Sequence, residues 1–515
     1  MNCRIYFLIP TFLLLIFEAG LAQSVAGLPR STPESEGVSS RDIIKFIDSS
    51  SKGKTEFHSF ILLRHGKVIA EAWWDPYKPY FKHTLYSCSK SFTATAIGFA
   101  INEKLLALDD KVIRFFPESL PDSVSVNLSK LTVKDVLMMS DGQEPDPSFL
   151  VAAKDSNWIK GFLATSLVHE PGTQFLYNSL GTYMLSAIIQ KVTRQKTIDY
   201  LTERLFDPLG IKGADWETDW QGINTGGWGL RLKTEDMAKF AELFLQNGNW
   251  NGKQVIPESW VKEASSMKIM QDPNAAQSKK DSSDWLQGYC YQMWRCRFNA
   301  YRGDGAFGQF MIVMPDQDAA LAITAETPDM QEEINLVWKY LLPALKNEKL
   351  PEDKAGDLIL ENKSKRLELP HPAGNVASIE GQLNGKQFSF DQNNEKIQKM
   401  SFNFGKEDCD VNLQTVKGNY KISFGAGKWK LGKTDFPGPS LTAQAIENNS
   451  MIFPAAIAGS YSWKDPATLE LILRYVESPH SEILTCHFIG NIIQIDIAKS
   501  IDFGKRSAKL LGKSE

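Results

Sequence analysis

The spacing of apolar residues changes at about residue 355, and this change constrains the fold more than any other feature of the chain. Beyond it, apolar residues alternate with other residues, as they do in half-buried β-strands. The clearest runs are 420–424, 469–475 and 493–497. A charged stretch at 346–354, which contains Pro351, precedes them. We therefore predict a linker there, followed by a β-rich accessory domain at 355–515.

The sequence before the linker predicts a different arrangement, in which helices lie between two β-hairpins. The hairpins pair 59–64 with 68–73 and 310–314 with 319–324. Helical patterns occur between them and after them, at 87–104, 132–139, 180–192, 234–247 and 332–345. Because both ends of this region carry strands, we expect an α+β domain at 28–347, with one antiparallel sheet flanked by helices and a mainly helical subdomain.

The N-terminus has the layout of a secretory signal peptide at 1–22. Arg4 precedes an apolar run at 5–17, and small residues follow just before Gln23. A transmembrane anchor is the alternative, but it needs about 20 apolar residues, and this run contains Pro10 and ends at Glu18. We therefore expect an exported protein, periplasmic or secreted, without a transmembrane anchor.

Composition narrows the range of partners. Charged residues make up 23% of the 515 residues and the net charge is −4, which gives no electrostatic reason to expect nucleic acid or an anionic membrane. The sequence contains no Cys-x-x-Cys and no His-Glu-x-x-His, so we expect no metal and no cofactor. Five cysteines follow the signal segment, and a disulfide between Cys290 and Cys296 is left open. The oligomeric state is not predicted.

Ser87 and Lys90 are the leading candidates for nucleophilic chemistry, although a bare Ser-x-x-Lys pattern is weak. Four other serines have the same spacing to a lysine: Ser49, Ser51, Ser259 and Ser265. Only Ser87 begins a mostly apolar helix rich in small residues, on which side chains at i and i+3 share a face. A lysine withdrawn from water tends to be neutral and can take the hydroxyl proton. The alternative is that Ser87 caps the helix and Lys90 extends to solvent.

Tyr177 is the candidate for a second acid/base group. A Pro-Gly turn precedes it and a helical run follows it. A phenol beside an ammonium group is expected to have a lowered pKa and to exchange protons. A structural tyrosine at a loop-to-helix junction is the alternative.

The glycine-rich segment 301–310 is the third candidate. Its glycines allow the backbone to approach a ligand closely, and a peptide N–H near Gly305 or Ala306 would bind a negatively charged oxygen together with the N–H groups at the start of the Ser87 helix. A phosphate-binding loop is disfavoured because the segment precedes a strand and lacks Gly-Lys-Ser/Thr. An ordinary glycine turn stays open.

In this order and spacing, the three segments resemble those of the class C β-lactamase-like serine hydrolases. This group includes esterases, D-amino-acid peptidases, penicillin-binding proteins and 6-aminohexanoate-dimer hydrolases. The resemblance extends from about residue 28 to 345, and residues 131–140 and 226–230 support it. It implies a β-lactamase/transpeptidase-like fold followed by an accessory domain.

The resemblance also implies roles for individual residues. Ser87 would be the acylated nucleophile, Lys90 the general base, and Tyr177 the group that carries a proton to the leaving group and later activates water. The N–H groups of Ser87 and of the Gly305/Ala306 stretch would hold the oxyanion.

Two departures from the family pattern bear on the substrate. Where β-lactamases carry Tyr-x-Asn, Ser179 stands at the position of the Asn. Where they carry Lys-Thr-Gly, this chain has Gly303-Asp304-Gly305. The missing lysine docks the carboxylate of a β-lactam, and Asp304 would repel that carboxylate unless Arg302 compensates. Both departures argue against an efficient β-lactamase, and with Gly308-Gln309 they resemble the esterase and amide-hydrolase branch.

The leading hypothesis is therefore a serine hydrolase that cleaves a carboxylic ester or small amide through a Ser87 acyl-enzyme. One alternative keeps the site and changes the substrate, giving a β-lactamase, a D-aminopeptidase or a penicillin-binding protein. Another, from a different class, is a catalytically silent binding or sensor protein that acts through its C-terminal domain.

Overall fold

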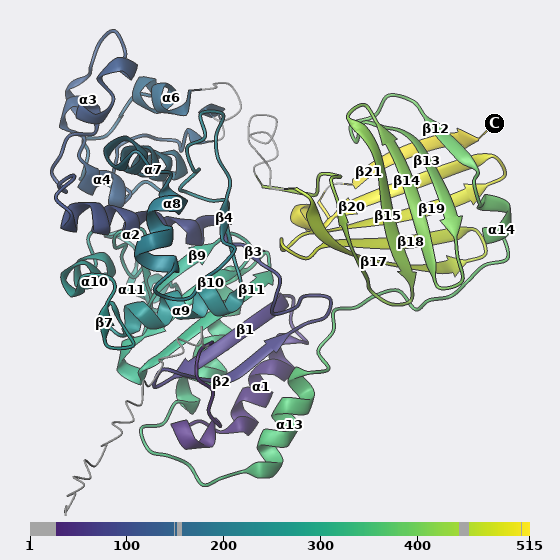
Figure 1. Ribbon diagram of the computed structural model, residues 1–515, viewed down its shortest axis with the longest axis horizontal. Coiled ribbons are helices and arrows are strands. Elements are labelled where there is room, and N and C mark those ends of the chain that lie inside the picture. The colour runs from purple at the N-terminus through teal and green to yellow at the C-terminus, as the bar shows by residue number, and fades with distance from the viewer. Residues whose placement is uncertain (1–26, 149, 152–156, 442–452, 506, 515) are drawn as a thin grey trace, which may run out of the picture.

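The computed structural model of the protein contains an α+β domain and a C-terminal β domain (Figure 1). It describes residues 27–148, 150–151, 157–441, 453–505 and 507–514. The predicted signal segment at 1–22 lies outside the described residues. Within those ranges, no helix is both long enough and apolar enough to cross a bilayer. The predicted fold class is confirmed by the order of the elements and by the pairing of the strands.

A six-stranded antiparallel sheet forms the centre of the first domain, in the order β2-β1-β11-β10-β9-β8. Its strands are β1 (Glu56–Arg64), β2 (Lys67–Trp73), β8 (Trp294–Arg295), β9 (Tyr301–Gly305), β10 (Gln309–Met314) and β11 (Ala319–Glu326). Phe60 and Leu62 belong to one core cluster and Ile61 and Leu63 to another, because successive side chains of a strand point to opposite faces. Both predicted hairpins are present, and pairing of β1 with β11 joins them.

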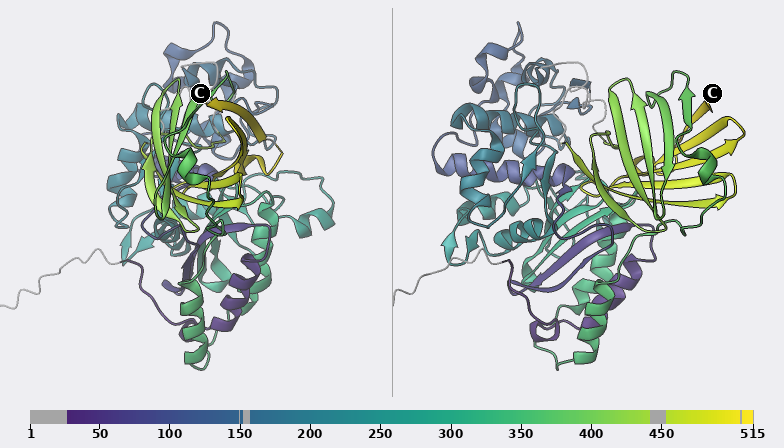
Figure 2. Two further views of the ribbon diagram at one scale, coloured as in Figure 1. Left: turned by 90° about the vertical axis from the view of Figure 1, so that its right-hand side faces the viewer. Right: turned by 45° about the vertical axis from the view of Figure 1, so that its right-hand side comes forward.

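Helices cover both faces of this sheet (Figures 1 and 2). On one face lie α1 (Ser40–Ser50), α12 (Met330–Leu336) and α13 (Lys354–Ser364), and on the other lie α2 (Ser89–Asn102) and α9 (Thr234–Leu245). In α1, for example, Ile43, Phe46 and Ile47 are fully buried, at the spacing that places them on one stripe of a helix. The sheet is therefore buried on both sides.

A mainly helical subdomain is inserted between the two hairpins. Its helices are α3 (Val126–Lys130), α4 (Val133–Leu137), α6 (Trp158–Ala164), α7 (Ser179–Thr193) and α8 (Thr197–Leu201), and α10 (Glu258–Ser265) and α11 (Gln277–Ser282) follow α9. Short strands complete the domain: β3 (His83–Thr84), β4 (Asp215–Trp216) and β5 (Leu230–Leu232) in one sheet, and β6 (Asn249–Trp250) and β7 (Lys253–Gln254) in another. α7 packs against α2, and the side chains of Lys90 and Ser179, in the first turns of the two helices, are in contact.

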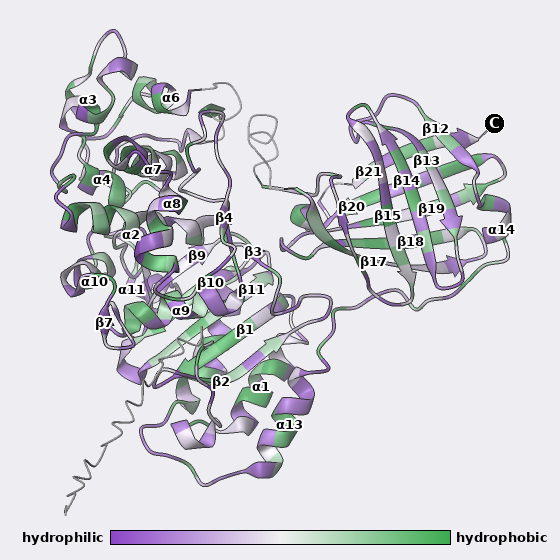
Figure 3. Ribbon diagram, viewed as in Figure 1, coloured by the Kyte–Doolittle hydropathy of each residue, from purple (hydrophilic) through white to green (hydrophobic). Residues whose placement is uncertain are grey.

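The C-terminal domain is a ten-stranded sheet in which a further pairing, β15 with β17, closes the sheet into a barrel. After α14 (Glu380–Leu383), the strands are β12 (Gln387–Phe390), β13 (Ile397–Phe404), β14 (Asp408–Thr415), β15 (Gly418–Ala426), β16 (Lys430–Thr434), β17 (Ala455–Asp465), β18 (Thr468–Tyr475), β19 (Ser481–Ile489), β20 (Ile492–Lys499) and β21 (Ser507–Ser514). Alternate residues, such as Leu469, Leu471 and Leu473, form its core, and Figure 3 shows the alternation of apolar and polar residues. The predicted period of two is confirmed.

Two boundaries differ from the prediction. The helix expected at 332–345 ends as α12 at Leu336 and continues as irregular helical turns, the last of which contains Pro343, whose missing N–H interrupts the helical hydrogen bonds. The predicted accessory domain at 355 begins with α13, but α13 packs against α1, and its Leu360 belongs to a core cluster of the first domain. The strands of the barrel begin only at Gln387.

The five cysteines of the described residues are buried and free. Cys290 donates its thiol to the Ser265 carbonyl at 3.2 Å, and the Cys296 sulfur accepts from the Arg302 guanidinium at 3.1 Å. The disulfide between Cys290 and Cys296, which the sequence left open, is not formed in this structure.

Candidate active site

Ser87 lies in a tight turn directly before α2. The turn spans Tyr86–Cys88 and has 3₁₀ geometry, and Lys90 follows in the first turn of the helix. The sequence pattern placed Ser87 on the helix, whereas the structure places it just before the helix begins. The distance between Lys90 Nζ and Ser87 Oγ is 3.1 Å, so the two side chains that the sequence paired are in contact.

Lys90 does not extend to solvent, because only 1% of the residue is exposed. Its side-chain nitrogen donates to Ser87 Oγ at 3.1 Å, to Ser179 Oγ at 3.1 Å and to the Gly227 carbonyl at 2.8 Å. Burial lowers the pKa of Lys90 to about 7, against the opposite effect of nearby carboxylates. The neutral form of the amine is therefore accessible near pH 7, and it can accept the Ser87 proton while it still donates to the other two acceptors.

Tyr177 lies over the same amine, with Lys90 Nζ 4.8 Å from the centre of its ring. The ring is stacked on Trp294 with 5.8 Å between centroids. Burial raises the pKa of Tyr177, although its interaction with the Ser87 side chain acts in the opposite direction. The sequence-based expectation of a lowered phenol pKa is wrong, because the loss of hydration and the charge of Asp304 outweigh the interaction with Ser87. The raised pKa keeps the Tyr177 phenol protonated at neutral pH.

The two residues after Tyr177 make different contacts: Asn178 caps α7, and Ser179 contacts Lys90. Asn178 is fully buried, and its side-chain oxygen accepts from the N–H groups of Leu180 and Gly181, which caps α7. Ser179, the first residue of α7, presents its hydroxyl to Lys90. The structure therefore brings Ser179 to the amine, as its predicted place in the pattern requires, and leaves Asn178 to fix the start of the helix.

The glycine-rich segment folds against the turn that holds Ser87. Gly305 ends β9, and a Cβ atom at this position would lie 2.1 Å from the Leu85 carbonyl oxygen, so only glycine fits. The Gln309 amide donates to the Ala306 carbonyl at 3.2 Å and to the Ala325 carbonyl at 2.8 Å. The peptide at Gly305 and Ala306 is thus fixed next to the Ser87 turn, where the predicted oxyanion-binding N–H groups would be needed.

A comparison with known proteins shows to which family the domain with this site belongs. The sequence model of the family described as Beta-lactamase matches residues 53–344, which is more than half of the chain. The chain belongs to the β-lactamase family. It is a hydrolase with the β-lactamase fold.

Individual relatives share part of the chain. A 6-aminohexanoate-dimer hydrolase from Paenarthrobacter ureafaciens is 27% identical over 293 residues, which cover 53% of this chain and 73% of the relative. Protein flp from Staphylococcus aureus strain MW2 is 28% identical over 174 residues, which cover 31% of this chain and 35% of flp, so the match spans about a third of flp. A solved structure from Bacillus anthracis, provisionally assigned as a 6-aminohexanoate-dimer hydrolase, has a TM-score of 0.52 at 21% identity and covers 64% of this chain and 90% of that one. This last likeness shows the fold.

Within the β-lactamase-family domain, Arg302 compensates the charge of Asp304. The Arg302 guanidinium donates to Asp304 Oδ2 at 2.8 and 3.2 Å, and both side chains are buried. It also donates to the Asp284 carbonyl at 2.8 Å and lies 4.3 Å over the Trp285 ring. The condition that the sequence left open is therefore met, and the pair adds no net charge at the position of the missing lysine.

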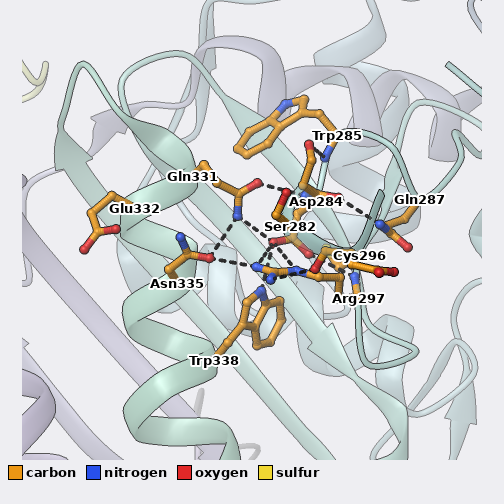
Figure 4. Close-up of polar contacts among 12 residues, drawn as sticks. Ser282, Asp284, Trp285, Gln287, Cys296, Arg297, Gln331, Glu332, Asn335 and Trp338 are labelled. Atoms are coloured by element: carbon orange, nitrogen blue, oxygen red, sulfur yellow. Dashed lines mark hydrogen bonds and ion pairs between the residues drawn. The ribbon is translucent and has the colours of Figure 1, made fainter. Parts of the chain in front are cut away.

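Asp284, whose carbonyl accepts from Arg302, is itself held by a network of side chains (Figure 4). Asp284 is fully buried, and its Oδ2 accepts from Arg297 at 2.8 Å, from Gln331 at 2.7 Å and from the Trp338 indole at 3.0 Å. These hydrogen bonds keep the pKa of Asp284 below its usual value, in spite of burial. The loop that carries Asp284 is thereby joined to α12 and the helical turn after it, and its carbonyl is aimed at Arg302.

Sequence reasoning missed two partners of the site. The Gly227 carbonyl accepts from Lys90. In the sequence, segment 226–230 supported the family resemblance, but nothing in it indicated a contact with Lys90. Asp146 accepts from the backbone N–H of Ser179 at 3.3 Å, and its charge opposes the lowering of the Lys90 pKa. No local pattern distinguishes Asp146 from other loop aspartates.

Glu333 is a buried carboxyl group next to Gly308 of the glycine-rich loop. It is expected to make the stability of the fold depend on pH. It lies on α12, is fully buried, and neither side-chain oxygen has a hydrogen-bond partner among the described residues. Burial raises the pKa of Glu333 well above its usual value. The unfolded chain ionises this group near pH 4.3, so stability is lost as the pH rises above that value.

We expect Glu333→Gln to remove this loss. The variant should gain about 1–3 kcal/mol of unfolding free energy relative to the wild type between pH 4 and pH 8, measured by urea denaturation across that range. Glu332→Gln, which changes the next residue on α12, is the control and should show no such trend. A difference between Glu333→Gln and wild type that stays the same at both ends of the pH range would contradict the assignment.

Proposed function

We propose that this protein is a serine hydrolase that cleaves a carboxylic ester or small amide through a Ser87 acyl-enzyme. The observation that supports it best is the buried Lys90 amine, which has a pKa of about 7 and lies 3.1 Å from Ser87 Oγ. A nucleophile in contact with a base whose pKa is near the working pH is the arrangement that covalent acyl transfer requires.

In the proposed acylation step, the Ser87 hydroxyl proton moves to the Lys90 amine as Ser87 Oγ bonds to the substrate carbonyl carbon. The carbonyl oxygen becomes an oxyanion, which the N–H groups of Ser87 and the Gly305/Ala306 stretch would bind. Collapse of the intermediate breaks the bond to the leaving group, which takes a proton through the Tyr177 hydroxyl. Water then attacks the acyl-enzyme, gives up its proton along the same route and restores the Ser87 hydroxyl.

Charge favours a neutral substrate over an anionic one. Arg302 lies near the position of the missing lysine, but its guanidinium is buried and already paired with Asp304 and with the Asp284 carbonyl. It cannot dock the carboxylate of a β-lactam without leaving Asp304 buried and unpaired. A small amide also agrees with the name of the Paenarthrobacter relative, because a dimer of 6-aminohexanoate is joined through an amide bond.

A substrate panel tests this proposal. The mature chain would be assayed with short-chain nitrophenyl esters, D-aminoacyl anilides and a chromogenic cephalosporin, and the intact protein mass would be recorded during turnover. We expect at least one neutral ester or amide to exceed the cephalosporin about tenfold or more in kcat/KM, with an acyl adduct on Ser87. Faster turnover of the cephalosporin would favour a β-lactamase instead. Absence of an adduct with every compound would favour a silent binding protein.

We also propose that the chain acts after export, in the periplasm or outside the cell. The proposal is supported by the signal-peptide pattern at 1–22. The five cysteines of the described residues are buried, which shields their thiols from oxidants in such a compartment.

A further inference from the structure

A loop of the C-terminal domain reaches the first domain beside the catalytic turn. The loop at 476–480 connects β18 and β19, and Val476 belongs to a core cluster of the first domain. The Glu477 carbonyl accepts from the Thr84 backbone N–H at 2.9 Å. The Glu477 carboxylate pairs with Arg231 at 3.1 Å. Thr84 is only a few residues before Ser87 in the chain. These contacts therefore fix the loop close to Ser87.

His480, at the end of this loop, is fully buried and links two residues of the first domain. Its Nδ1 lies 2.7 Å from Glu326 Oε1, which also accepts from Ser500 at 2.8 Å, and its Nε2 lies 2.5 Å from the Tyr86 hydroxyl. A carboxylate can only accept, so Nδ1 carries the proton. With the proton on Nδ1, Nε2 is the nitrogen that can accept from the Tyr86 hydroxyl. Burial raises the pKa of Tyr86, which keeps this hydroxyl a donor.

The residues that His480 touches stand directly beside the two peptides assigned to the oxyanion. Tyr86 precedes Ser87, and Phe307 follows Ala306. Both have positive φ, +46° at Tyr86 and +68° at Phe307, which is a costly conformation for a residue with a side chain. The His480 ring meets the Phe307 ring edge-on, with 4.8 Å between centroids. One imidazole therefore contacts both strained residues and helps to hold them.

The two domains also line a pocket of about 90 Å³ at this place. Its walls include Tyr86 and Trp228 from the first domain and Tyr475 and Glu477 from the second. Trp228 directly follows Gly227, whose carbonyl accepts from Lys90. The C-terminal domain is therefore in contact with the surroundings of both members of the Ser87–Lys90 pair.

We propose that His480 is a positioning residue for catalysis, through which the C-terminal domain holds the peptides at Ser87 and Ala306 in the geometry that binds the oxyanion. This inference rests on the proposed function, because it concerns the same acyl transfer. It assigns the C-terminal domain a part in the first domain's chemistry, in place of a separate accessory task. Oxyanion binding acts on the transition state more than on the bound substrate, so loss of His480 lowers kcat and leaves KM nearly unchanged.

The test compares full-length His480→Ala, His480→Gln, Tyr86→Phe and the double variant Tyr86→Phe/His480→Ala. Glutamine can place an amide oxygen where Nε2 accepts from Tyr86. His487→Ala is the matched control, because His487 lies on β19 of the same domain with 39% of its side chain exposed. Each variant is first treated with a fluorophosphonate, and the fraction of molecules labelled at Ser87 is determined from the intact-protein mass. Rates of labelling and of ester hydrolysis are then expressed per labelled molecule, so that misfolded protein is not counted.

We expect His480→Ala to lower kcat about 10- to 100-fold, with KM changed less than about threefold. His480→Gln should recover part of the loss, and His487→Ala should stay within about twofold of wild type. The double variant should be no worse than about twofold below the poorer single variant, because the two groups act through one hydrogen bond.

Three results would overturn the inference: equal kcat per labelled molecule in His480→Ala and His487→Ala, a loss confined to KM, or losses in Tyr86→Phe and His480→Ala that multiply. Failure of the proposed function looks different, because wild-type Ser87 would then not be labelled at all. That outcome would overturn both proposals.

Discussion

Replacement of Ser87 by alanine is expected to abolish acyl-enzyme formation and to lower kcat/KM by about 10⁴-fold or more. The reason is geometric: among the described residues, Lys90 donates to two hydroxyl groups, Ser87 Oγ and Ser179 Oγ, and only Ser87 lies in the turn directly before α2. Intact-mass measurement after treatment with a fluorophosphonate checks the adduct, and ester hydrolysis checks the rate.

Ser265→Ala is the matched control for this prediction. Ser265 also has a lysine three residues later, but its hydroxyl donates to the Val261 carbonyl, and Lys268 pairs with Glu263 at 2.6 Å. In this second Ser-x-x-Lys pattern, the serine hydroxyl and the lysine amine therefore each have another partner. This variant should be labelled and should turn over ester as the wild type does. Equal labelling of wild type and Ser87→Ala would remove Ser87 from the nucleophile's role.

The parts of the fold and site that sequence predicts are those with a local signature. The alternation of Leu469, Leu471 and Leu473 defines a half-buried strand in any context. The contact between Ser87 and Lys90 follows from their spacing of three residues in a helical turn. It forms although Ser87 lies in a 3₁₀ turn just before the helix. The order of the three motifs along the chain then indicated the family, which the match at residues 53–344 shows.

The remaining features depend on residues that are distant in sequence. The pKa of Tyr177 is raised because the folded chain removes water from its phenol, and no neighbour in the sequence indicates that. The sequence alone does not indicate that Arg302 neutralises Asp304, because the Asp284 carbonyl and the Trp285 ring help to fix the guanidinium. The contact of Tyr86 with His480 joins residues 394 positions apart, and such pairs have no local pattern.

Lys90→Met is expected to lower the acylation rate about 10²- to 10⁴-fold, because it removes the proton acceptor and keeps much of the buried volume. Its pH dependence is the sharper test. The base acts in its neutral form, so in the wild type the rate should rise about tenfold per pH unit below pH 7 and level off above it, as the pKa of about 7 requires. Lys90→Met should lose this rise. Stopped-flow labelling from pH 5 to pH 9 measures both quantities.

Stability separates this effect from damage to the fold. The pKa of Lys90 is lower in the folded state than in the unfolded chain. Between about pH 7 and the ordinary pKa of a lysine, the unfolded chain therefore binds more protons than the folded chain. Protonation of the amine at those pH values favours the unfolded state. Removing the amine relieves that cost, so Lys90→Met should melt no lower than wild type at pH 7 while it loses activity. Lys239→Met, at a lysine that is only 5% exposed on α9, should retain the wild-type rate and its rise with pH. A rise that persists in Lys90→Met would mean that another group takes the Ser87 proton, and Tyr177 with its raised pKa could not produce an inflection near pH 7.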